Sequence, residues 1–268
     1  PKPGQLFRNP YMAKVLQSLG TYGATDGFYN GFPGKSIVET IQKHGGVMTM
    51  DDLTNHTSTY PEPICVNYRG INVWEVPPNG QGIAGLIALE GLNALEESGK
   101  ITSTSLQHDL ETTHPQQSSE MLHAQIEMMR LGFGDSRAYV CDSDFIQQTN
   151  DSGDGQMKSS SEWLLDKERI SKRALELFNN EKAVVHGKPA KISCTVSFQV
   201  VDEDGNAMGF VNSNYMGFGT GLTPKTCGFT LQNRGAGFSL DPTHPNALEP
   251  RKRPYHTIIP AIMTHADT

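Results

Sequence analysis

The sequence predicts an α+β fold, with most helices in its first part and strands concentrated after residue 194. Before residue 179, several stretches place apolar residues at helical spacing between start and stop signals. Residues 62–76 hold two short runs rich in β-branched and aromatic side chains. From Thr195 onward, apolar and polar residues alternate, which is typical of strands.

The first predicted helix begins at Asn9 and Pro10, because Asn is a good N-cap and Pro is tolerated at the first helical position. We expect it to end at Gly20. A second helix is predicted over residues 34–44, where a pair of glycines directly follows.

A β-hairpin is predicted over residues 62–76, with its turn at Arg69 and Gly70. Proline and glycine crowd into residues 77–82, which predicts a loop. This loop leads into a predicted helix over residues 83–97.

Two more helices are predicted, over residues 118–135 and 167–178. The Ser- and Thr-rich residues 98–105 form the connector before the first of them. Residues 150–160 are polar and contain glycine, which makes them the best candidate for a linker.

The clearest hairpin in the chain follows Thr195. If Gly205 ends a three-residue turn in the left-handed conformation, Asp202 pairs with Asn206. Counting outward from that pair places Thr195 opposite Ser213, with two hydroxyl groups on one face of the hairpin. A slip of one residue would reverse that face, so this prediction depends on the turn.

Composition excludes several classes of function. The net charge of −7 and the lack of a basic block argue against nucleic-acid binding. No apolar run approaches the ~20 residues that span a membrane. The four cysteines lie far apart and the histidines are scattered, so we expect neither a metal nor another cofactor. Residues 214–221 have only G-x-G-x-G spacing, without the context of a nucleotide-binding loop.

Four stretches carry a family resemblance: YPEPICVNYRGINVWEVPPNGQG, LGFGDSRAYVCDSDF, TVSFQVVDEDGNAMGFVNSNYMGFGTG and GFTLQNRGAGFSLDPTHPNALEPRKRPYHTIIPA. They occur in the family's order, and the resemblance as a whole extends over nearly the entire chain, from Leu6 to the end. The sequence therefore resembles the γ-glutamyltransferase family of N-terminal-nucleophile hydrolases. The resemblance implies a four-layer αββα sandwich, of which this chain represents a part.

The resemblance also implies that a precursor cuts itself between Cys194 and Thr195. Residues 1–194 would then end the large subunit, residues 195–268 would begin the small subunit, and the two would stay associated. Thr195 becomes the nucleophile, and its freed α-amine serves as the base. An α-amine has an ordinary pKa of about 7.7–8.0, which suits that task near neutral pH. From composition alone, Thr195 would be an ordinary strand residue.

Ser213 corresponds to the hydroxyl residue that assists the nucleophile, and Tyr215 is either a pocket wall or a buried aromatic residue. Gly237 stands where the family's transpeptidases carry an aspartate that binds the substrate ammonium. Arg234 lies nearby in the sequence and is either a carboxylate-binding residue or a surface arginine.

His256 and Thr257 replace the family's paired serines, which bind the substrate's α-carboxylate. The alternative interpretation of His256 is a core or loop histidine; it is not expected to be a base, because the α-amine already fills that role. These departures favour the acylase-like branch, whose acyl group ends in a carboxylate without a neighbouring amine. The resemblance places the family's Gly-Gly oxyanion donors after Thr268 and its substrate-carboxylate arginine before Pro1.

The predicted function is acyl transfer from a γ-glutamyl or glutaryl-type amide, through an acyl-Thr195 intermediate, to water or an amine acceptor. One alternative is glutathione hydrolase or transpeptidase activity proper. Another is an inactive family member with an intact Cys194–Thr195 bond. The chain begins at Pro1 rather than Met and is predicted to be a fragment or a processed piece, so no compartment is assigned.

Overall fold

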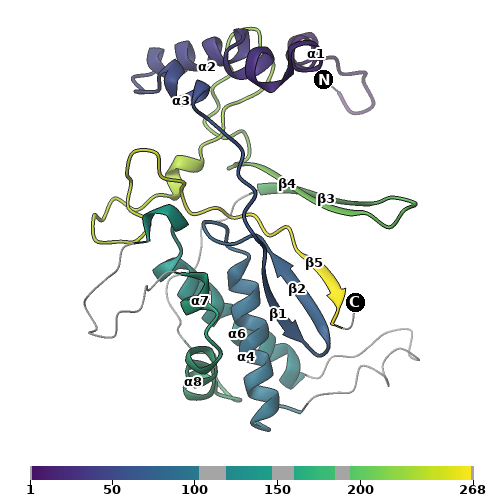
Figure 1. The fold of residues 1–268 in the computed structure, drawn as a ribbon, viewed down its shortest axis with the longest axis vertical. Coiled ribbons are helices and arrows are strands. Elements are labelled where there is room, and N and C mark those ends of the chain that lie inside the picture. The colour runs from purple at the N-terminus through teal and green to yellow at the C-terminus, as the bar shows by residue number, and fades with distance from the viewer. Residues whose placement is uncertain (1, 103–118, 147–159, 185–193, 267–268) are drawn as a thin grey trace. The chain divides into compact units, whose positions relative to one another are not determined.

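The fold combines helices and strands, which confirms the predicted α+β content (Figure 1). The computed structural model describes residues 2–102, 119–146, 160–184 and 194–266. All but the last residue of the predicted linker, and the last three residues of the predicted 98–105 connector, lie outside these ranges. Within the described residues, no helix combines the length and apolar character needed to cross a membrane.

The chain forms two compact units, each made of segments that are distant in sequence. The first unit comprises Pro1–Tyr60, Ile192–Cys194 and Ser213–Arg234, and the second comprises Pro61–Lys191, Thr195–Asn212 and Gly235–Thr268.

Helix α1 (Pro10–Ala24) opens the first unit. Its start is as predicted, because the Asn9 side chain accepts a hydrogen bond from the Met12 amide at 3.1 Å. The predicted end at Gly20 is wrong. The break comes at Gly23, whose φ of 73° is non-helical, and a π-helix (η1, Thr25–Tyr29) follows.

Helix α2 (Phe32–Lys43) begins two residues before the predicted start, because Pro33 is accommodated in its first turn. The short helix α3 (Met50–Thr54) was not predicted. A capping box starts it: the Asp52 carboxylate accepts from the Thr49 amide at 2.7 Å.

The loop after residue 215 is tied to these helices within the first unit. The Asn9 amide group donates to the Gly228 carbonyl oxygen at 2.6 Å, so one side chain both caps α1 and holds the loop. The Ser36 hydroxyl in α2 likewise donates to the Lys225 carbonyl oxygen at 2.8 Å. Polar contacts therefore join segments about 200 residues apart in sequence.

In the second unit, β1 (Ile64–Tyr68) and β2 (Ile71–Glu75) form the predicted antiparallel hairpin. Its turn residues, Arg69 and Gly70, have φ values of 52° and 81°, as a two-residue hairpin turn requires. An unpredicted strand, β5 (Ile262–His265), pairs antiparallel with β2 and completes a three-stranded sheet of order β1-β2-β5.

Four helices accompany this sheet: α4 (Ile83–Glu97), α6 (Ser119–Tyr139), α7 (Ser161–Leu164) and α8 (Lys167–Leu177). The predicted bounds of α4 are confirmed. Helix α6 continues four residues past its predicted end at Asp135, so Asp135 lies inside the helix and its side chain forms ion pairs with α8. Helix α7 was not predicted.

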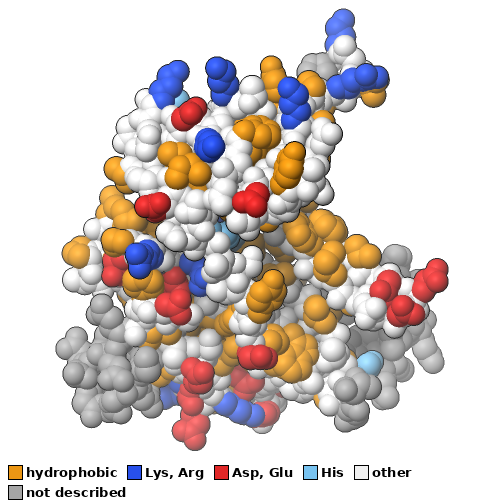
Figure 2. Space-filling view, turned by 45° about the horizontal axis from the view of Figure 1, so that its top comes forward, with side chains coloured by type: hydrophobic (Ala, Val, Ile, Leu, Met, Phe, Trp, Pro, Cys, Tyr) orange, Lys and Arg blue, Asp and Glu red, His pale blue; other side chains and the backbone are white. Residues whose placement is uncertain are grey.

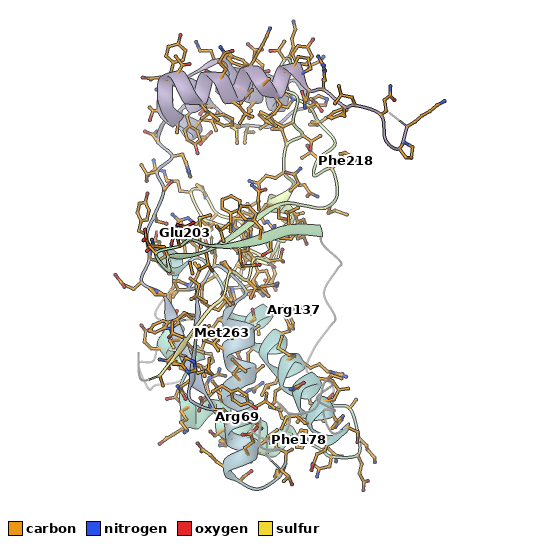
Figure 3. All side chains as sticks on the ribbon, turned by 90° about the vertical axis from the view of Figure 1, so that its right-hand side faces the viewer. Arg69, Arg137, Phe178, Glu203, Phe218 and Met263 are labelled. Carbon is orange, nitrogen blue, oxygen red and sulfur yellow. The ribbon has the colours of Figure 1, made fainter. Side chains whose placement is uncertain are left out.

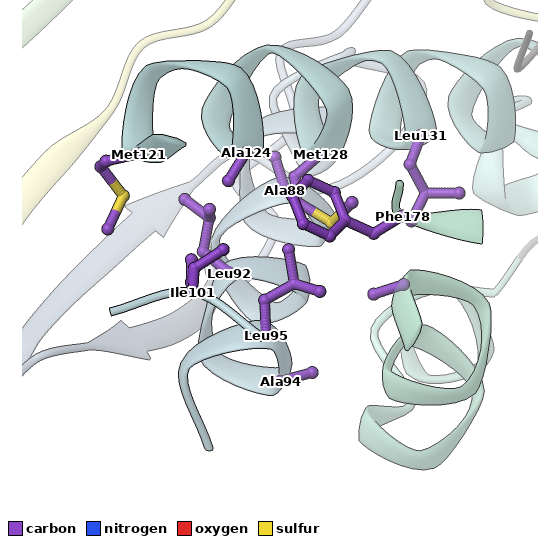
Figure 4. Packing of buried hydrophobic residues seen from close by; sticks show 11 residues of the cluster. Ala88, Leu92, Ala94, Leu95, Ile101, Met121, Ala124, Met128, Leu131 and Phe178 are labelled. Atoms are coloured by element: carbon purple, nitrogen blue, oxygen red, sulfur yellow. The ribbon is translucent and has the colours of Figure 1, made fainter. Parts of the chain in front are cut away.

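The core of the second unit lies where α4 packs against α6 and α8 (Figure 4). Leu95 from α4 and Met128 from α6 are fully buried within it. Gly132 lets α6 approach α4 closely, since a Cβ at this position would collide with the Ala84 carbonyl oxygen.

Two buried aspartates join the second unit's segments. Asp135 in α6 forms ion pairs with Arg169 at 2.8 Å and Arg173 at 2.7 Å, both from α8. Asp142 caps the 3-10 helix η2 (Ser143–Phe145) and accepts from the Arg253 amide at 2.7 Å. These contacts agree with a structural role for both carboxylates.

We expect Gly132→Ala to lower the free energy of unfolding by about 1–3 kcal/mol, because the new methyl group forces α4 and α6 apart. The matched control is Gly85→Ala in α4, where a Cβ meets no heavy atom within 4 Å. This control should gain up to about 1 kcal/mol, because alanine is the better helix former. Urea titration of both variants measures the difference, and equal values would contradict the close-packing assignment.

Candidate functional site

The second hairpin is formed by β3 (Cys194–Val201) and β4 (Ala207–Tyr215). The Asp202 amide donates to the Asn206 carbonyl oxygen at 3.0 Å, and Gly205 has a φ of 84°. The predicted three-residue turn and the Asp202–Asn206 pair are therefore confirmed. Glu203 lies at the tip of this hairpin (Figure 3).

The Asp202 carboxylate organises the turn. It accepts from the Asn206 side-chain amide and backbone amide, both at 2.8 Å, and from the Asp204 backbone amide at 3.1 Å. Hydrogen bonds from Asn206, first from its side chain and then its backbone, lower the pKa of this carboxyl group. Farther along, the Phe198 and Phe210 rings stack with centroids 4.8 Å apart, which agrees with the same register.

Thr195 is the second residue of β3 and is exposed, whereas Ser213 lies near the end of β4 and is half-buried. The Ser213 hydroxyl oxygen accepts a hydrogen bond from the Tyr215 amide at 2.9 Å. Thr195 belongs to the second unit and Ser213 to the first. Their placement opposite one another stays a prediction.

Arg234 is packed against an aromatic ring in the first unit. Its guanidinium carbon lies 4.5 Å from the centroid of the Tyr215 ring, and the residue is only 4% exposed. The alternative of a surface arginine is therefore wrong, and Tyr215 contacts a buried cation. Burial lowers the pKa of the Arg234 guanidinium, but an arginine remains charged near neutral pH.

Hydrogen bonds hold the segment before Arg234 beside the end of β4. The Asn233 amide donates to the Asn214 carbonyl oxygen at 3.2 Å, and the Met216 amide donates to the Asn233 side chain at 3.1 Å. The side chain of Asn214 donates to the Thr230 hydroxyl oxygen at 3.1 Å. Arg234 then begins the 3-10 helix η4 (Arg234–Gly237).

In the second unit, one buried amide side chain links Gly237 to the segment that contains His256 and Thr257. Asn246, 3% exposed, donates to the Gly237 carbonyl oxygen at 2.7 Å and accepts from the Tyr255 amide at 3.0 Å. Asn246 therefore joins Gly237 to Tyr255, the residue directly before His256.

The proline- and glycine-rich loop before α4 holds the same segment from another direction. The His256 amide donates to the Asn79 carbonyl oxygen at 2.9 Å, and the Gln81 amide donates to the His256 carbonyl oxygen at 2.8 Å. The Gln81 side chain donates to the Thr257 carbonyl oxygen at 3.2 Å and accepts from the Tyr255 hydroxyl at 3.2 Å. The loop fixes the backbone at positions 256 and 257.

Sequence reasoning did not single out Asn246, Gln81 or Tyr255. Their hydrogen-bond partners lie between nine and 176 residues away in the sequence, and no pattern of neighbouring residues predicts such contacts. The only available signal was the occurrence of amide side chains in segments dense with proline and glycine, where backbone groups need partners.

The described residues contain no group of three or more His, Cys, Asp or Glu side chains that is arranged to hold a metal ion. Each unit offers its own groups: the first holds the Ser213 hydroxyl and the buried Arg234 guanidinium, and the second holds the Thr195 hydroxyl and the backbone at positions 256 and 257. In general, a guanidinium can bind an anion and a hydroxyl group can act as a nucleophile.

Replacing Asn246 tests its contacts with Gly237 and Tyr255. We expect Asn246→Leu to lower the free energy of unfolding by about 2–4 kcal/mol, since two buried backbone groups lose their partners. Asn246→Asp keeps the acceptor for the Tyr255 amide but places an oxygen against the Gly237 carbonyl. Hydrogen exchange should therefore show the Tyr255 amide protected in Asn246→Asp and unprotected in Asn246→Leu. Equal protection in both variants would contradict the assigned contact.

Comparison with known proteins finds matches along the whole chain. A family profile described as gamma-glutamyltranspeptidase matches residues 1–268. The glutathione hydrolase-like YwrD proenzyme of Bacillus subtilis is 35% identical over 263 residues, covering 98% of this chain and 45% of that protein. The oxamate amidohydrolase proenzyme of Klebsiella pneumoniae is 29% identical over 261 residues, covering 97% of this chain and 44% of that protein.

A solved structure is also similar. The cephalosporin acylase from Bacillus halodurans aligns with a TM-score of 0.75 at 35% identity, over 100% of this chain and 44% of that one. The chain thus spans less than half the length of each of these proteins.

Proposed function

The chain belongs to the gamma-glutamyltranspeptidase family, and on that premise we propose that the whole protein is a self-processing N-terminal-threonine amidohydrolase. The observation that carries this proposal is the register of the β3–β4 hairpin. The Asp202–Asn206 pair supports the count that leads back to Thr195. The proenzyme names of the relatives are in keeping with self-cleavage.

We propose the following chemistry. The Thr195 oxygen attacks the amide carbonyl carbon, and its proton passes through the α-amine of the same residue to the departing nitrogen. The C–N bond breaks, the amine leaves, and the acyl group remains as an ester on Thr195. Water or an amine acceptor then attacks the ester and restores the hydroxyl group. Ser213 assists the nucleophile in this scheme.

We propose further that the preferred acyl group ends in a carboxylate without a neighbouring ammonium. Arg234, buried against Tyr215, is suited to bind a carboxylate through charge-assisted hydrogen bonds. Gly237 supplies no carboxylate for an ammonium, and a Cβ there would lie 3.0 Å from the Tyr255 carbonyl oxygen. A glutaryl amide therefore suits these residues better than a γ-glutamyl amide does.

The four-layer αββα sandwich belongs to the same proposal. Both strands of the β3–β4 hairpin expose large apolar side chains, and Figure 2 shows hydrophobic side chains at the molecular surface. Val196 and Val201 are 67% and 69% exposed, and Met208 is 51% exposed. Such a surface calls for a covering layer, and the chain spans under half the length of its relatives.

Self-processing is tested by the intact mass of the full-length protein after incubation near neutral pH. We expect two fragments that meet at Cys194 and Thr195, and a single uncut chain for Thr195→Ala. The matched control is Ser197→Ala on the same strand, which should cleave like the unaltered protein. An uncut chain without substitution would favour an inactive family member and remove the proposed function.

Substrate preference is tested with glutaryl, γ-glutamyl and butyryl amides of one chromogenic amine. We expect the glutaryl amide to have the highest kcat/KM, and Arg234→Gln to lower that value roughly 10- to 100-fold, as the loss of a charged hydrogen bond predicts. The uncharged butyryl amide should be little affected by the same variant. A higher kcat/KM for the γ-glutamyl amide would support the glutathione hydrolase alternative, which several relatives' names favour.

A further inference from the structure

A cavity of about 390 Å³ lies within the second unit, between the β1–β2 hairpin and helices α4 and α6. Its walls are mostly apolar, and its lining includes Val73, Leu86, Leu89, Leu92 and Met129. The volume falls in the range of small-molecule sites, which bury an apolar body and orient it with a few polar groups.

Glu75, the last residue of β2, is the one charged residue among those that line this cavity. It is 4% exposed, and its Oε2 atom is buried without a hydrogen-bond partner in the described part of the chain. The carboxyl group lies against Gly82, the N-cap of α4, where any Cβ would collide with it. Glycine at position 82 therefore leaves room for the carboxyl group.

An unpaired carboxylate is costly in such surroundings. Removing its charge from water without a counter-charge costs several kcal/mol, so the group either takes up a proton or acquires a cationic partner. Burial raises the pKa of Glu75 to about 7, opposed by a hydrogen bond from the Val76 amide. Near neutral pH, the Glu75 carboxyl group can therefore either stay protonated or ionise and pair with a cation.

We propose that this cavity binds a small organic ammonium ion, with its nitrogen paired to Glu75 and its alkyl body packed against Leu86, Leu92 and Met129. None of the residues that line the cavity is among those assigned to acyl transfer. The proposal rests on the cavity and its buried acid, and it stands whether or not the proposed function is correct.

The test uses the full-length protein and two probes of equal length, n-hexylamine and 1-hexanol, followed by isothermal titration calorimetry. We expect the amine to bind at least tenfold more tightly than the alcohol at pH 8. Glu75→Gln should abolish that preference while leaving the weak binding of the alcohol. Equal affinities, preference for the amine in Glu75→Gln, or no binding of either probe would overturn the proposal.

A second variant keeps the test decisive if Glu75→Gln fails to fold. Gly85 lines the cavity, and a Cβ there meets no heavy atom within 4 Å, so Gly85→Leu should fill the space and weaken both probes together. Amine binding that is unchanged in Gly85→Leu would place the amine elsewhere and overturn the proposal.

The affinity for the amine should also rise with pH. With the pKa of Glu75 at about 7, its ionised fraction increases ~10-fold between pH 6 and pH 8, and hexylamine stays protonated throughout. Tyr68 is the other titratable group in the lining, and burial raises the pKa of its phenol, so it remains neutral. An affinity that is constant across this range would contradict pairing with Glu75.

Discussion

The packing of α4 is the constraint on which most of the second unit depends. This helix is buried along most of its length, against β1 and β2, α6 and α8. Close approach to α6 requires Gly132, because any side chain there would meet the backbone of α4. The position of α4 then fixes the loop before it, which carries Gln81, and the cavity beside it, which Leu86 and Leu92 line. Core packing and the polar contacts of the candidate site are thus linked through one element.

Buried amide side chains provide hydrogen-bond partners for backbone groups, as regular secondary structure does elsewhere in the chain. Residues 237–257 contain little helix or strand, so their backbone groups need other partners. Asn246 and Gln81 provide them and connect segments that are remote in sequence. These hydrogen bonds hold a loop-rich region in one conformation, which the substrate-binding role proposed for this segment would require.

The charges near the two candidate sites have opposite signs. A buried guanidinium, Arg234, lies against Tyr215 in the first unit, and a buried carboxyl group, Glu75, lines the cavity in the second. A buried charge favours ligands of the opposite charge and disfavours ligands of the same charge. The chemistry proposed for each site follows from this difference.

Elements whose signals are local could be predicted from the sequence alone. The bounds of α4, the turn at Arg69 and Gly70, and the turn that ends at Gly205 all follow from the dihedral preferences of a few adjacent residues. Family motifs supplied Thr195 and the other site residues, whose roles stay predictions.

The long-range partners of strands and buried side chains could be identified only from the three-dimensional structure. Strand β5 has four exposed residues and gains its conformation by pairing with β2, nearly 200 positions earlier. The burial of Arg234, the contacts of Asn246 and the cavity beside Glu75 likewise arise from segments that are distant in sequence. These contacts are determined by core packing and by the need of buried polar groups for hydrogen-bond partners. The spacing of neighbouring residues in the sequence predicts neither of these two factors.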